Sequence, residues 1–567
     1  MLGAVLRTSV SLTLTTPVVF FAVETLPGDA ASASAQSTST TVIDAQRERL
    51  GLDRPVLERF GDWLGGLMTG RLGETADTGV PVADLIAGPM RSTAVLAVAA
   101  LVPAVILGVT LGVLAGTRAS GRLDRAISSA SSALMATPEF VVAVGLLVLL
   151  SLWSGLLPPV SLFDTGSSPL TEPSLLVLPA ATLAVVASAP LSRYIRAVVA
   201  TENARDHVEA ARLAGLSEPR VVRRHLLPGA LAPMAQACAS LTPYVVGGTI
   251  VVEQVFGYPG IGSLLVSRIA ARDTVTVATV TMILAAIVAV SFCIADVCRP
   301  MARDGAGSMR AVVVWSALWC PVVVVALFGG GLARLLGVVD PGAPIGAPFT
   351  SDGLLGTDYL GRSVAAQLLV GGRSLVLAPL AAAVVAEAVA LIVSSTMIWS
   401  HRWRTAVTTV MDVLLIIPPM LLILVVVTGT GFAAWTLVLL VAAVTVPFAS
   451  RYLTAAGTEI AASGYVETAL AVGDSRALVA VRDVAPNLVR PALTDLGVRF
   501  CGAVHLVAAV VFLGGATGDS TGSWATMIQR NLEGVMLNPW SVCAPALAIV
   551  GLTVPLTMIA DRWTQRR

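Results

Sequence analysis

Long apolar runs recur along almost the whole chain, and they constrain its fold more than any other feature. A helix needs about 20 mostly apolar residues to cross the hydrocarbon core of a bilayer. Such runs recur throughout the 567 residues, of which 56% are hydrophobic and only 13% are charged. Soluble domains carry about 25% charged residues, because much of any folded surface stays in water. We therefore expect an all-α polytopic membrane protein with about 12 transmembrane helices.

The expected spans fall into two series of six. The first series comprises residues 4–24, 93–116, 134–156, 174–192, 230–254 and 274–297. The second series comprises residues 311–337, 373–398, 408–428, 432–450, 492–514 and 541–560. Two parallel six-helix halves follow from this arrangement.

Arginine placement predicts the orientation of these spans. Every second connection between them carries an arginine cluster, whereas the alternate connections are long and rich in Pro, Gly and Ser. Positively charged connections stay in the cytoplasm, so we expect a multi-pass protein with both termini cytoplasmic. We assign residues 1–300 to the first half, with an external segment at 27–91. Residues 301–310 form the expected linker, and residues 311–567 form the second half.

Several classes of function are disfavoured by composition. The chain contains no lysine, and a Walker A loop needs one to hold nucleotide phosphates. Its six cysteines lack C-x-x-C spacing and its four histidines are far apart, which weakens disulfide and metal-site interpretations. A net charge of +1 gives no global field for nucleic acid. We expect no catalytic residues, no metal, no cofactor held by this chain and no nucleic-acid partner.

One polar segment in each half interrupts the apolar pattern, and the two segments are related. Each contains a glutamate, a glycine six residues later and a proline thirteen residues after the glycine. These residues are Glu209, Gly215 and Pro228 in the first copy, and Glu467, Gly473 and Pro486 in the second. The offset is 258, and six expected spans separate the copies. We therefore predict a parallel internal repeat whose two segments face the same side.

Local chemistry predicts the shape of each segment. "VEAARLAG" is a run of good helix formers that ends at Gly215, a residue suited to the left-handed conformation after a helix. Ser217 is placed to cap a second short helix, and Pro228 marks the return toward the bilayer. We expect a pair of short helices on which another protein docks. An ordinary basic loop obeying the charge rule is the alternative, but it does not explain the repeated spacing.

The two segments resemble the EAA loops of ATP-binding-cassette (ABC) importer permeases, which contact the ATPase. The resemblance implies ATPase-coupling roles for Glu209, Ala210, Ala211, Gly215 and Pro228, and for Glu467, Ala469, Gly473 and Pro486. The second copy departs from the family pattern at Thr468 and Ala485.

The resemblance extends along nearly the whole chain. "LPGDAA" (26–31) and "VVEQVFGYPGIG" (251–262) resemble the B-type permease of dipeptide, oligopeptide and nickel importers. "LLGTDYLGRSV" (354–364) and "SWATMI" (523–528) resemble the C-type permease. The implied protein is a fusion of both permeases in a bacterial cytoplasmic membrane. It is not an enzyme, and it moves peptides or small solutes such as nickel complexes. The implied partners are two ABC ATPase subunits or domains, which bind ATP and Mg, an extracytoplasmic substrate-binding protein and membrane lipid.

One acidic residue and two rival functions remain open at this point. Glu253 lies at the outer end of an expected span, and acids within membranes are functional candidates by default. It either lines the translocation path or pairs locally near the interface. An ion-coupled secondary transporter with two parallel repeats is the main alternative function, and "GRLDR" (121–125) faintly resembles a loop of such carriers. A non-transporting scaffold or sensor is the third.

Overall fold

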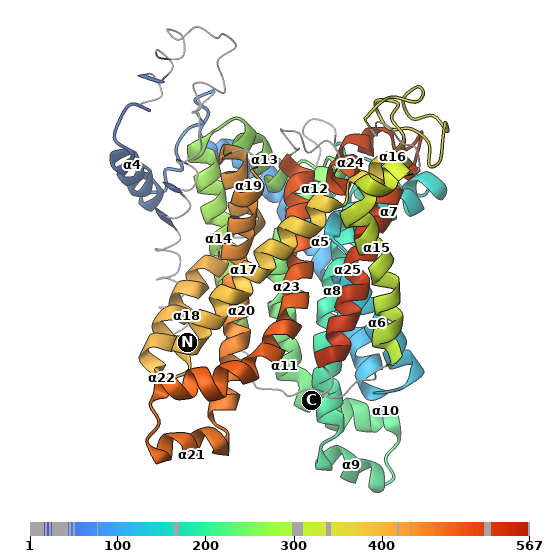
Figure 1. Ribbon diagram of the computed structural model, residues 1–567. Coiled ribbons are helices and arrows are strands. Elements are labelled where there is room, and N and C mark those ends of the chain that lie inside the picture. Colours follow the sequence, from blue (N-terminus) through green and yellow to red (C-terminus); the bar gives the residue numbers. More distant parts are fainter. Residues whose placement is uncertain are drawn as a thin grey trace. The chain divides into compact units, whose positions relative to one another are not determined.

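The computed structural model describes residues 52–75, 78–163, 169–296, 310–335, 342–416, 419–430, 433–514 and 523–564, with a few single residues before them. Regular structure in these ranges is helical, and the only β pairing consists of three isolated bridges. The expected all-α class is confirmed (Figure 1). The chain divides into two compact units, Met1–Gly305 and Ala306–Arg567. The division falls within the expected linker at 301–310.

The first unit is built from long helices joined by short ones. Its helices are α4 (Val56–Met68), α5 (Val82–Thr117), α6 (Arg122–Met135), α7 (Glu139–Leu147), η1 (Val148–Trp153), α8 (Pro173–Asn203), α9 (Asp206–Leu213), α10 (Glu218–Val221), η2 (Val222–Leu226), α11 (Leu227–Ala239), α12 (Leu241–Phe256), α13 (Ile261–Ala270) and α14 (Thr274–Asp296).

The second unit repeats much of this order. Its helices are α15 (Arg310–Leu335), α16 (Val364–Val370), α17 (Arg373–Met397), α18 (His401–Ile416), α19 (Pro419–Thr430), α20 (Ala434–Ala461), α21 (Gly464–Val472), α22 (Arg476–Val479), η3 (Ala480–Val484), α23 (Ala485–Gly514), α24 (Trp524–Asn531), η4 (Leu532–Gly534) and α25 (Trp540–Thr564).

Six helices in the described ranges are long and apolar enough to cross a membrane. They are Val82–Thr117, Pro173–Asn203, Val364–Met397, Ala434–Ala461, Arg476–Gly514 and Trp540–Ile559. Two bent pairs, Arg122–Met135 with Glu139–Trp153 and Glu218–Ala239 with Tyr244–Phe256, raise the number to eight. Helices α14 and α15 coincide with two more expected spans, and the expected span at 408–428 falls partly on α18 and partly on α19. The span at 4–24 lies mostly outside the described residues, so the total of twelve stays a prediction.

One expectation about the first unit needs correction. The span at 134–156 is not one straight helix, because α6 and α7 meet at 106°. Pro138 lies between them, and a residue that precedes proline is disfavoured in the α-helical region. Helix α5 begins at Val82 and so includes residues 82–91 of the expected external segment.

Glycines bring α5 and α8 close together in the first unit. Gly108, Gly112 and Gly116 lie four residues apart, on one face of α5. A Cβ at Gly112 would lie 2.5 Å from the Cβ of Ile195 and 2.8 Å from the carbonyl oxygen of Ser192. Small residues at such intervals let membrane helices approach closely, because no hydrophobic effect drives helices together in lipid. Close van der Waals packing therefore holds this pair.

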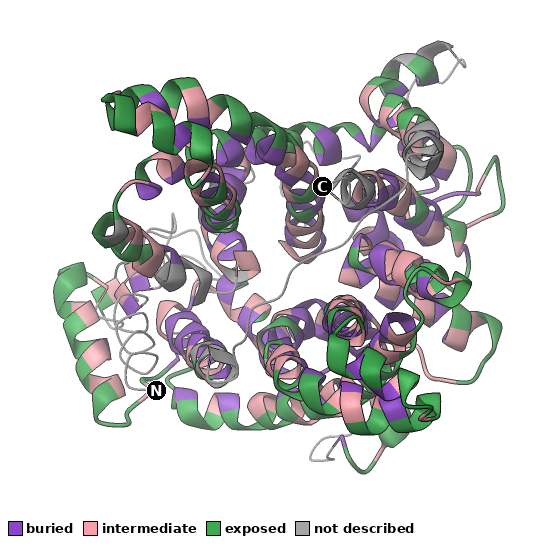
Figure 2. Ribbon diagram, turned by 90° about the horizontal axis from the view of Figure 1, so that it is seen from below, coloured by how far each residue is buried: buried purple, intermediate pink, exposed green. Residues whose placement is uncertain are grey.

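The second unit uses alanine for the same purpose. Ala382, Ala386 and Ala390 are fully buried and lie four residues apart on α17. Ala390 packs with Ala449 and Leu453 of α20. Within each unit, Figure 2 shows buried residues where the long helices lie beside other helices and exposed residues on their opposite sides.

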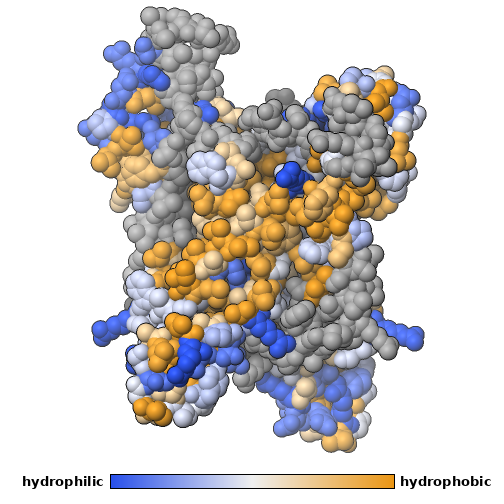
Figure 3. Space-filling model, in the orientation of Figure 1, coloured by the Kyte–Doolittle hydropathy of each residue, from blue (hydrophilic) through white to orange (hydrophobic). Residues whose placement is uncertain are grey.

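One face of α17 is exposed and apolar, as contact with lipid requires. Large hydrophobic side chains on this helix are exposed, and apolar residues dominate this part of the surface (Figure 3). These exposed residues include Leu377, Leu380, Val384 and Ile392. Contiguous apolar surface of this kind is unusual for a protein in water and is expected for one in lipid.

Candidate coupling site

The first polar segment comes directly after α8. It consists of helix α9, a glycine in the left-handed conformation and a second helical stretch that begins with α10. The N–H of Gly215 bonds to the carbonyl of Arg212 at 2.9 Å, and the N–H of Leu216 bonds to that of Ala211 at 3.3 Å. This pair of bonds is a Schellman motif, which needs a positive φ at the residue after the helix. Gly215 supplies it with φ +79°.

The second polar segment ends its first helix in the same way. Gly473 has φ +104°, its N–H bonds to the carbonyl of Leu470, and the N–H of Asp474 bonds to that of Ala469, both at 3.1 Å. Ser475 then caps α22 by accepting a hydrogen bond from the N–H of Leu478 at 3.3 Å. Ser217 occupies the corresponding N-cap position in the first copy, but its side chain makes no capping bond.

Both copies are anchored by buried apolar residues at matching positions. The four pairs, all at the offset of 258, are Val208 and Val466, Val221 and Val479, Leu226 and Val484, and Ala230 and Leu488. Each of these side chains is at most 2% exposed. In the second unit this cluster includes Ile398 and packs against residues from α20 and α21. The polar segments are therefore braced against the helices that carry them.

The expected second short helix does not stand alone in either copy. Helices α10, η2 and α11 follow one another without a break, as do α22, η3 and α23. The π-helical turns η2 and η3 also repeat at the offset of 258. Pro228 and Pro486 each lie two residues beyond such a turn. A proline ring crowds the carbonyl four residues before it, and a wider π turn relieves that crowding.

Charged residues form hydrogen bonds across the turn of each polar segment, but the residues that pair differ between the two copies. In the first, Arg212 donates to Glu218 Oε1 at 2.7 Å and to Asn203 Oδ1 at 2.6 Å. In the second, Arg482 donates to Asp474 Oδ2 at 2.6 Å. The anchors and glycines were duplicated, whereas the ion pairs across the turn are specific to each copy.

A buried carboxylate joins the first segment to the end of α8. Glu202 is 4% exposed, and its Oε2 lies 3.1 Å from Nε of Arg205. A Cβ at Gly229 would overlap its carboxyl group, so α11 passes directly over Glu202. Glu202 and Gly229 could not be paired from the sequence, because only the fold brings them together.

The expected coupling residues mostly face outward. Glu209, Ala210, Gly215 and Pro228 are exposed in the first copy, and Glu467, Gly473 and Pro486 are exposed in the second. Ala211 is buried against the anchors and Ala469 is half-buried. Large apolar side chains also project from the same helices, since Leu213 is 83% exposed and Val472 is 81% exposed.

Glu253 occupies a different place, inside the turn between α12 and α13. It is fully buried and accepts hydrogen bonds from Thr93 Oγ1 at 2.6 Å, Gly262 N at 2.7 Å and Ser263 N at 3.1 Å. Thr93 Oγ1 in turn accepts from the N–H of Ile261 at 2.8 Å. Thr93 and Glu253 therefore satisfy the first free N–H groups of α13. This geometry favours the local role over the path-lining role for Glu253.

A second buried acid braces α6 against α8. Asp124 is 2% exposed, and its two oxygens accept from Nε and Nη2 of Arg196 at 2.7 and 2.8 Å. Nearby, the hydroxyls of Ser131 and Ser192 lie 2.8 Å apart, and Arg193 donates to Ser132 at 2.8 Å. "GRLDR" (121–125) thus contains a structural brace, and its faint resemblance to secondary carriers has a local explanation.

Comparison with known proteins agrees with the repeated architecture. The family described as "Binding-protein-dependent transport system inner membrane component" matches the chain twice, over residues 108–303 and 380–566. The glutathione transport system permease protein GsiC of Escherichia coli O6:H1 is 30% identical over 264 residues, covering 46% of this chain and 84% of that protein. The oligopeptide transport system permease protein OppB of Mycobacterium bovis is 34% identical over 271 residues, covering 45% and 82%.

A Bacillus relative has the same relation to this chain. The oligopeptide transport system permease protein AppB of Bacillus subtilis is 30% identical over 253 residues, covering 44% of this chain and 80% of AppB. Each of these relatives is therefore aligned over most of its own length, but the aligned region covers less than half of this chain. The chain belongs to the family of binding-protein-dependent transport system inner membrane components, and it carries two copies of the permease domain in one polypeptide.

Proposed function

We propose that this chain supplies both membrane halves of an ABC importer in a bacterial cytoplasmic membrane. Its cargo is di- or oligopeptides or related small solutes such as glutathione or nickel complexes, delivered by an extracytoplasmic binding protein. ATP and Mg bind to two separate ATPase subunits or domains. The proposal rests on the twofold family match and on relatives that are named as oligopeptide and glutathione permeases.

The observation that carries the proposal is the duplicated polar segment. Each copy combines a left-handed glycine, a π turn and four buried anchors with an exposed outer face. An isolated exposed apolar residue needs no explanation. Here, however, Leu213 and Val472 are the last residues of α9 and α21, both are exposed, and each helix also carries an exposed glutamate, a pattern typical of a docking surface.

The braced geometry suggests how force would pass through these segments. Buried anchors and the Glu202 contact join the first segment to α8 and α11, so a displacement of α9 would be transmitted to both of these helices. Closure of the ATPases on ATP would then favour one arrangement of the halves over the other. Such coupling requires that nucleotide-bound and nucleotide-free ATPases differ in their affinity for the two arrangements.

The two glutamates are assigned to recognition of the ATPase. Glu209 and Glu467 lie in the first turns of α9 and α21. Within the described residues, neither carboxylate has an ion-pair partner. Each is therefore available to a basic group on the partner, while Gly215 and Gly473 set the angle at which the following helix leaves.

Replacement of Leu213 tests docking directly. Leu213→Arg places a charge at the centre of the proposed contact, and buried contacts of this kind contribute enough that we expect stimulation of ATP hydrolysis to fall about tenfold or more. The measurement is ATPase activity of the copurified ABC subunits with the full chain in nanodiscs. Gly215→Pro, which removes the N–H that bonds to Arg212, should uncouple in the same way.

Leu162→Arg is the matched control for this experiment. Leu162 is 72% exposed and precedes the N-terminal end of α8, whereas Leu213 follows its C-terminal end. The Leu162→Arg variant should leave the stimulation of ATP hydrolysis unchanged. Normal stimulation by both Leu213→Arg and Gly215→Pro would contradict docking at the first segment. Uptake that depends on an ion gradient and not on ATP would favour the secondary-transporter alternative.

A further inference from the structure

A histidine connects three elements of the first polar segment. His207 lies in the first turn of α9, and its Nε2 donates to the carbonyl oxygen of His225 in η2 at 3.2 Å. The same nitrogen lies 3.6 Å from Oε1 of Glu202, at the end of α8. One imidazole therefore meets a backbone acceptor and a buried carboxylate together.

A glycine leaves room for this arrangement. A Cβ at Gly229 in α11 would overlap Oε1 of Glu202, the oxygen that faces His207. The other carboxylate oxygen, Oε2, lies 3.1 Å from Nε of Arg205. Glu202 is 4% exposed, and a buried charge is costly unless it has partners. His207 and Arg205 are placed to be those partners.

The second copy makes the equivalent contact with neutral groups. Tyr465 takes the place of His207 at the offset of 258. The side-chain amide of Asn487 donates to the carbonyl of Asp483 at 2.7 Å and to the hydroxyl of Tyr465 at 3.2 Å. Asp483 corresponds to His225 and takes part through its backbone, so the same carbonyl is bonded in both π turns.

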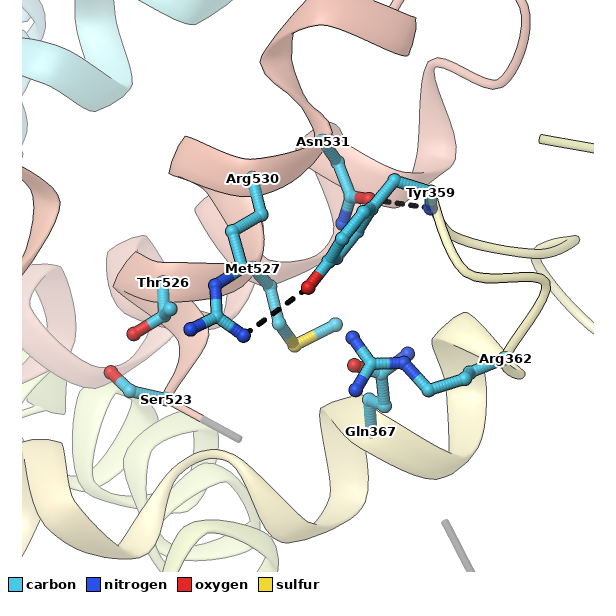
Figure 4. Close-up of a pocket in the computed structure, with 8 residues that line it drawn as sticks. All are labelled: Tyr359, Arg362, Gln367, Ser523, Thr526, Met527, Arg530 and Asn531. Carbon is cyan, nitrogen blue, oxygen red and sulfur yellow. Dashed lines mark hydrogen bonds between the residues drawn. The ribbon is translucent and has the colours of Figure 1, made fainter. Parts of the chain in front are cut away.

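The ionisable side chains of this contact belong to the first copy. The three ionisable residues and their neutral counterparts are Glu202 and Ile460, Arg205 and Ser463, and His207 and Tyr465. The second unit uses a tyrosine hydroxyl as a neutral acceptor at another place as well, since Tyr359 accepts from Arg530 at 3.3 Å (Figure 4). Tyrosine and asparagine side chains stay neutral between pH 5 and 8, whereas histidine ordinarily changes its charge there.

The other charged side chains near His207 in the sequence of α9 and η2 are exposed. Within the described residues, none of them forms an ion pair. They are Asp206, Glu209, Arg223 and Arg224. The imidazole of His225 is half-buried, and this residue enters the contact through its backbone carbonyl. Glu202 therefore supplies the negative charge that His207 meets.

We propose that His207 is a pH-dependent positioning residue, which holds α9 against α8 and η2 most firmly when the imidazole is protonated. Protonation keeps the N–H that bonds to η2 and adds a positive charge beside the Glu202 carboxylate. Charge-assisted hydrogen bonds are stronger than neutral ones, so the contact weakens as the pH rises and the imidazole loses its charge. The contact belongs to this chain alone, whereas its effect on ATP hydrolysis rests on the proposed function.

Spin labels at the ends of α9 and α21 measure the effect in each segment. Leu213→Cys and Val472→Cys are made separately in a chain whose six native cysteines are replaced by alanine. Each is labelled with a nitroxide and placed in nanodiscs without ATPase. We expect the mobile fraction of the Leu213→Cys label to rise about threefold from about pH 6 to about pH 8, as for a partly exposed ion pair. The Val472→Cys label should show no change.

Variants then assign the response to His207. His207→Gln keeps a donor for the carbonyl of η2 but cannot change its charge, so the Leu213→Cys label should have the same mobility at both pH values. Glu202→Ile, His207→Tyr and Gly229→Asn together give the first copy the residues of the second, and this variant should keep α9 ordered at both pH values. His225→Gln is the matched control and should keep the pH response, because only the backbone of this residue takes part.

The pH response of the Leu213→Cys label decides the proposal. The proposal is overturned if the label does not respond in the parent chain, if the response persists in His207→Gln or if His225→Gln abolishes it. With the ABC subunits present, the stimulation of ATP hydrolysis by the parent relative to His207→Gln should be larger at about pH 6 than at about pH 8. An equal ratio would overturn the role of His207 in coupling. A label that responds in a chain without any stimulation would support the contact and contradict the proposed docking.

Discussion

At the scale of single residues, the buried acids of the first unit are explained by their immediate partners. Asp124 meets Arg196 with two short hydrogen bonds, and Glu253 receives three donors from α5 and the start of α13. Burial of a charged or polar group is costly unless it is hydrogen-bonded. The position of an acid within a membrane protein therefore does not by itself indicate that it lines the translocation path. The hydrogen-bond partners of Asp124 and Glu253 give both residues a local structural role.

Replacement of Glu253 separates the capping role from the path role. Glu253→Ala leaves two backbone N–H groups and the Thr93 hydroxyl without their acceptor, and unsatisfied groups cost about 1–3 kcal/mol each. We expect a loss of about 3 kcal/mol in stability, seen as a lower Tm of the purified chain. Glu253→Gln keeps an acceptor oxygen and should lose less.

Glu209→Ala is the control, since Glu209 is exposed and has no ion-pair partner in the described residues. Its Tm should equal that of the parent chain. A Glu253→Ala variant with an unchanged Tm but impaired uptake would contradict the capping role and return Glu253 to the path.

At the scale of secondary-structure elements, small residues decide how closely the central helices pack. Gly108, Gly112 and Gly116 are spaced for this purpose on α5, and alanines take the corresponding place on α17. This spacing was visible in the sequence and was missed, because hydropathy marks a span without indicating which face meets another helix. The "GxxxG" interval was the signal that would have found it.

Gly112→Ala tests this packing. Its new methyl group would lie within 3 Å of Ile195 and of the Ser192 carbonyl, and overpacking of this kind costs about 1–3 kcal/mol. We expect a lower Tm for the purified chain in detergent. Gly145→Ala in α7 is the control, because a Cβ there meets nothing within 4 Å. Equal Tm values for the two variants would show that α5 and α8 tolerate a wider separation.

At the scale of the whole molecule, the two units repeat one plan with local differences. The order of elements, the buried anchors and the π turns are duplicated. The ion pairs across the turns differ, and no acid among the described residues caps the start of α24 as Glu253 caps α13. The duplicated glycines, anchors and π turns position each polar segment on the helices that carry it. The ion pairs across the turns are not needed for that position and differ between the two units.

Labelling of the two segments tests the parallel repeat. Six expected spans separate Glu209 from Glu467, and an even number places both on one side of the membrane. Glu209→Cys and Glu467→Cys, each in a chain whose six native cysteines are replaced by alanine, should react with an impermeant maleimide only after the membrane is opened. Leu162→Cys should react in intact cells. Reaction of Glu209→Cys and Glu467→Cys from opposite sides would disprove the parallel repeat and the proposed importer.

Much of this architecture follows from the amino-acid sequence by itself. Apolar run length determines that the chain is helical and meets lipid, and spacing of Glu, Gly and Pro reveals the repeat. The roles of Gly215 and Gly473 at the ends of their helices can be predicted from sequence, because a positive φ depends on one residue and its neighbours. By contrast, the break at Pro138 and the continuous run from Arg476 to Gly514 were misjudged from local pattern.

Only the tertiary structure decided which polar groups meet. Thr93 reaches Glu253 across 160 residues, and Asn531 reaches Tyr359 across 172. Hydropathy and turn chemistry act over a few neighbouring residues, so they leave a record in short stretches of sequence. Hydrogen-bond partners between distant segments depend on how whole helices pack, and no short stretch records that.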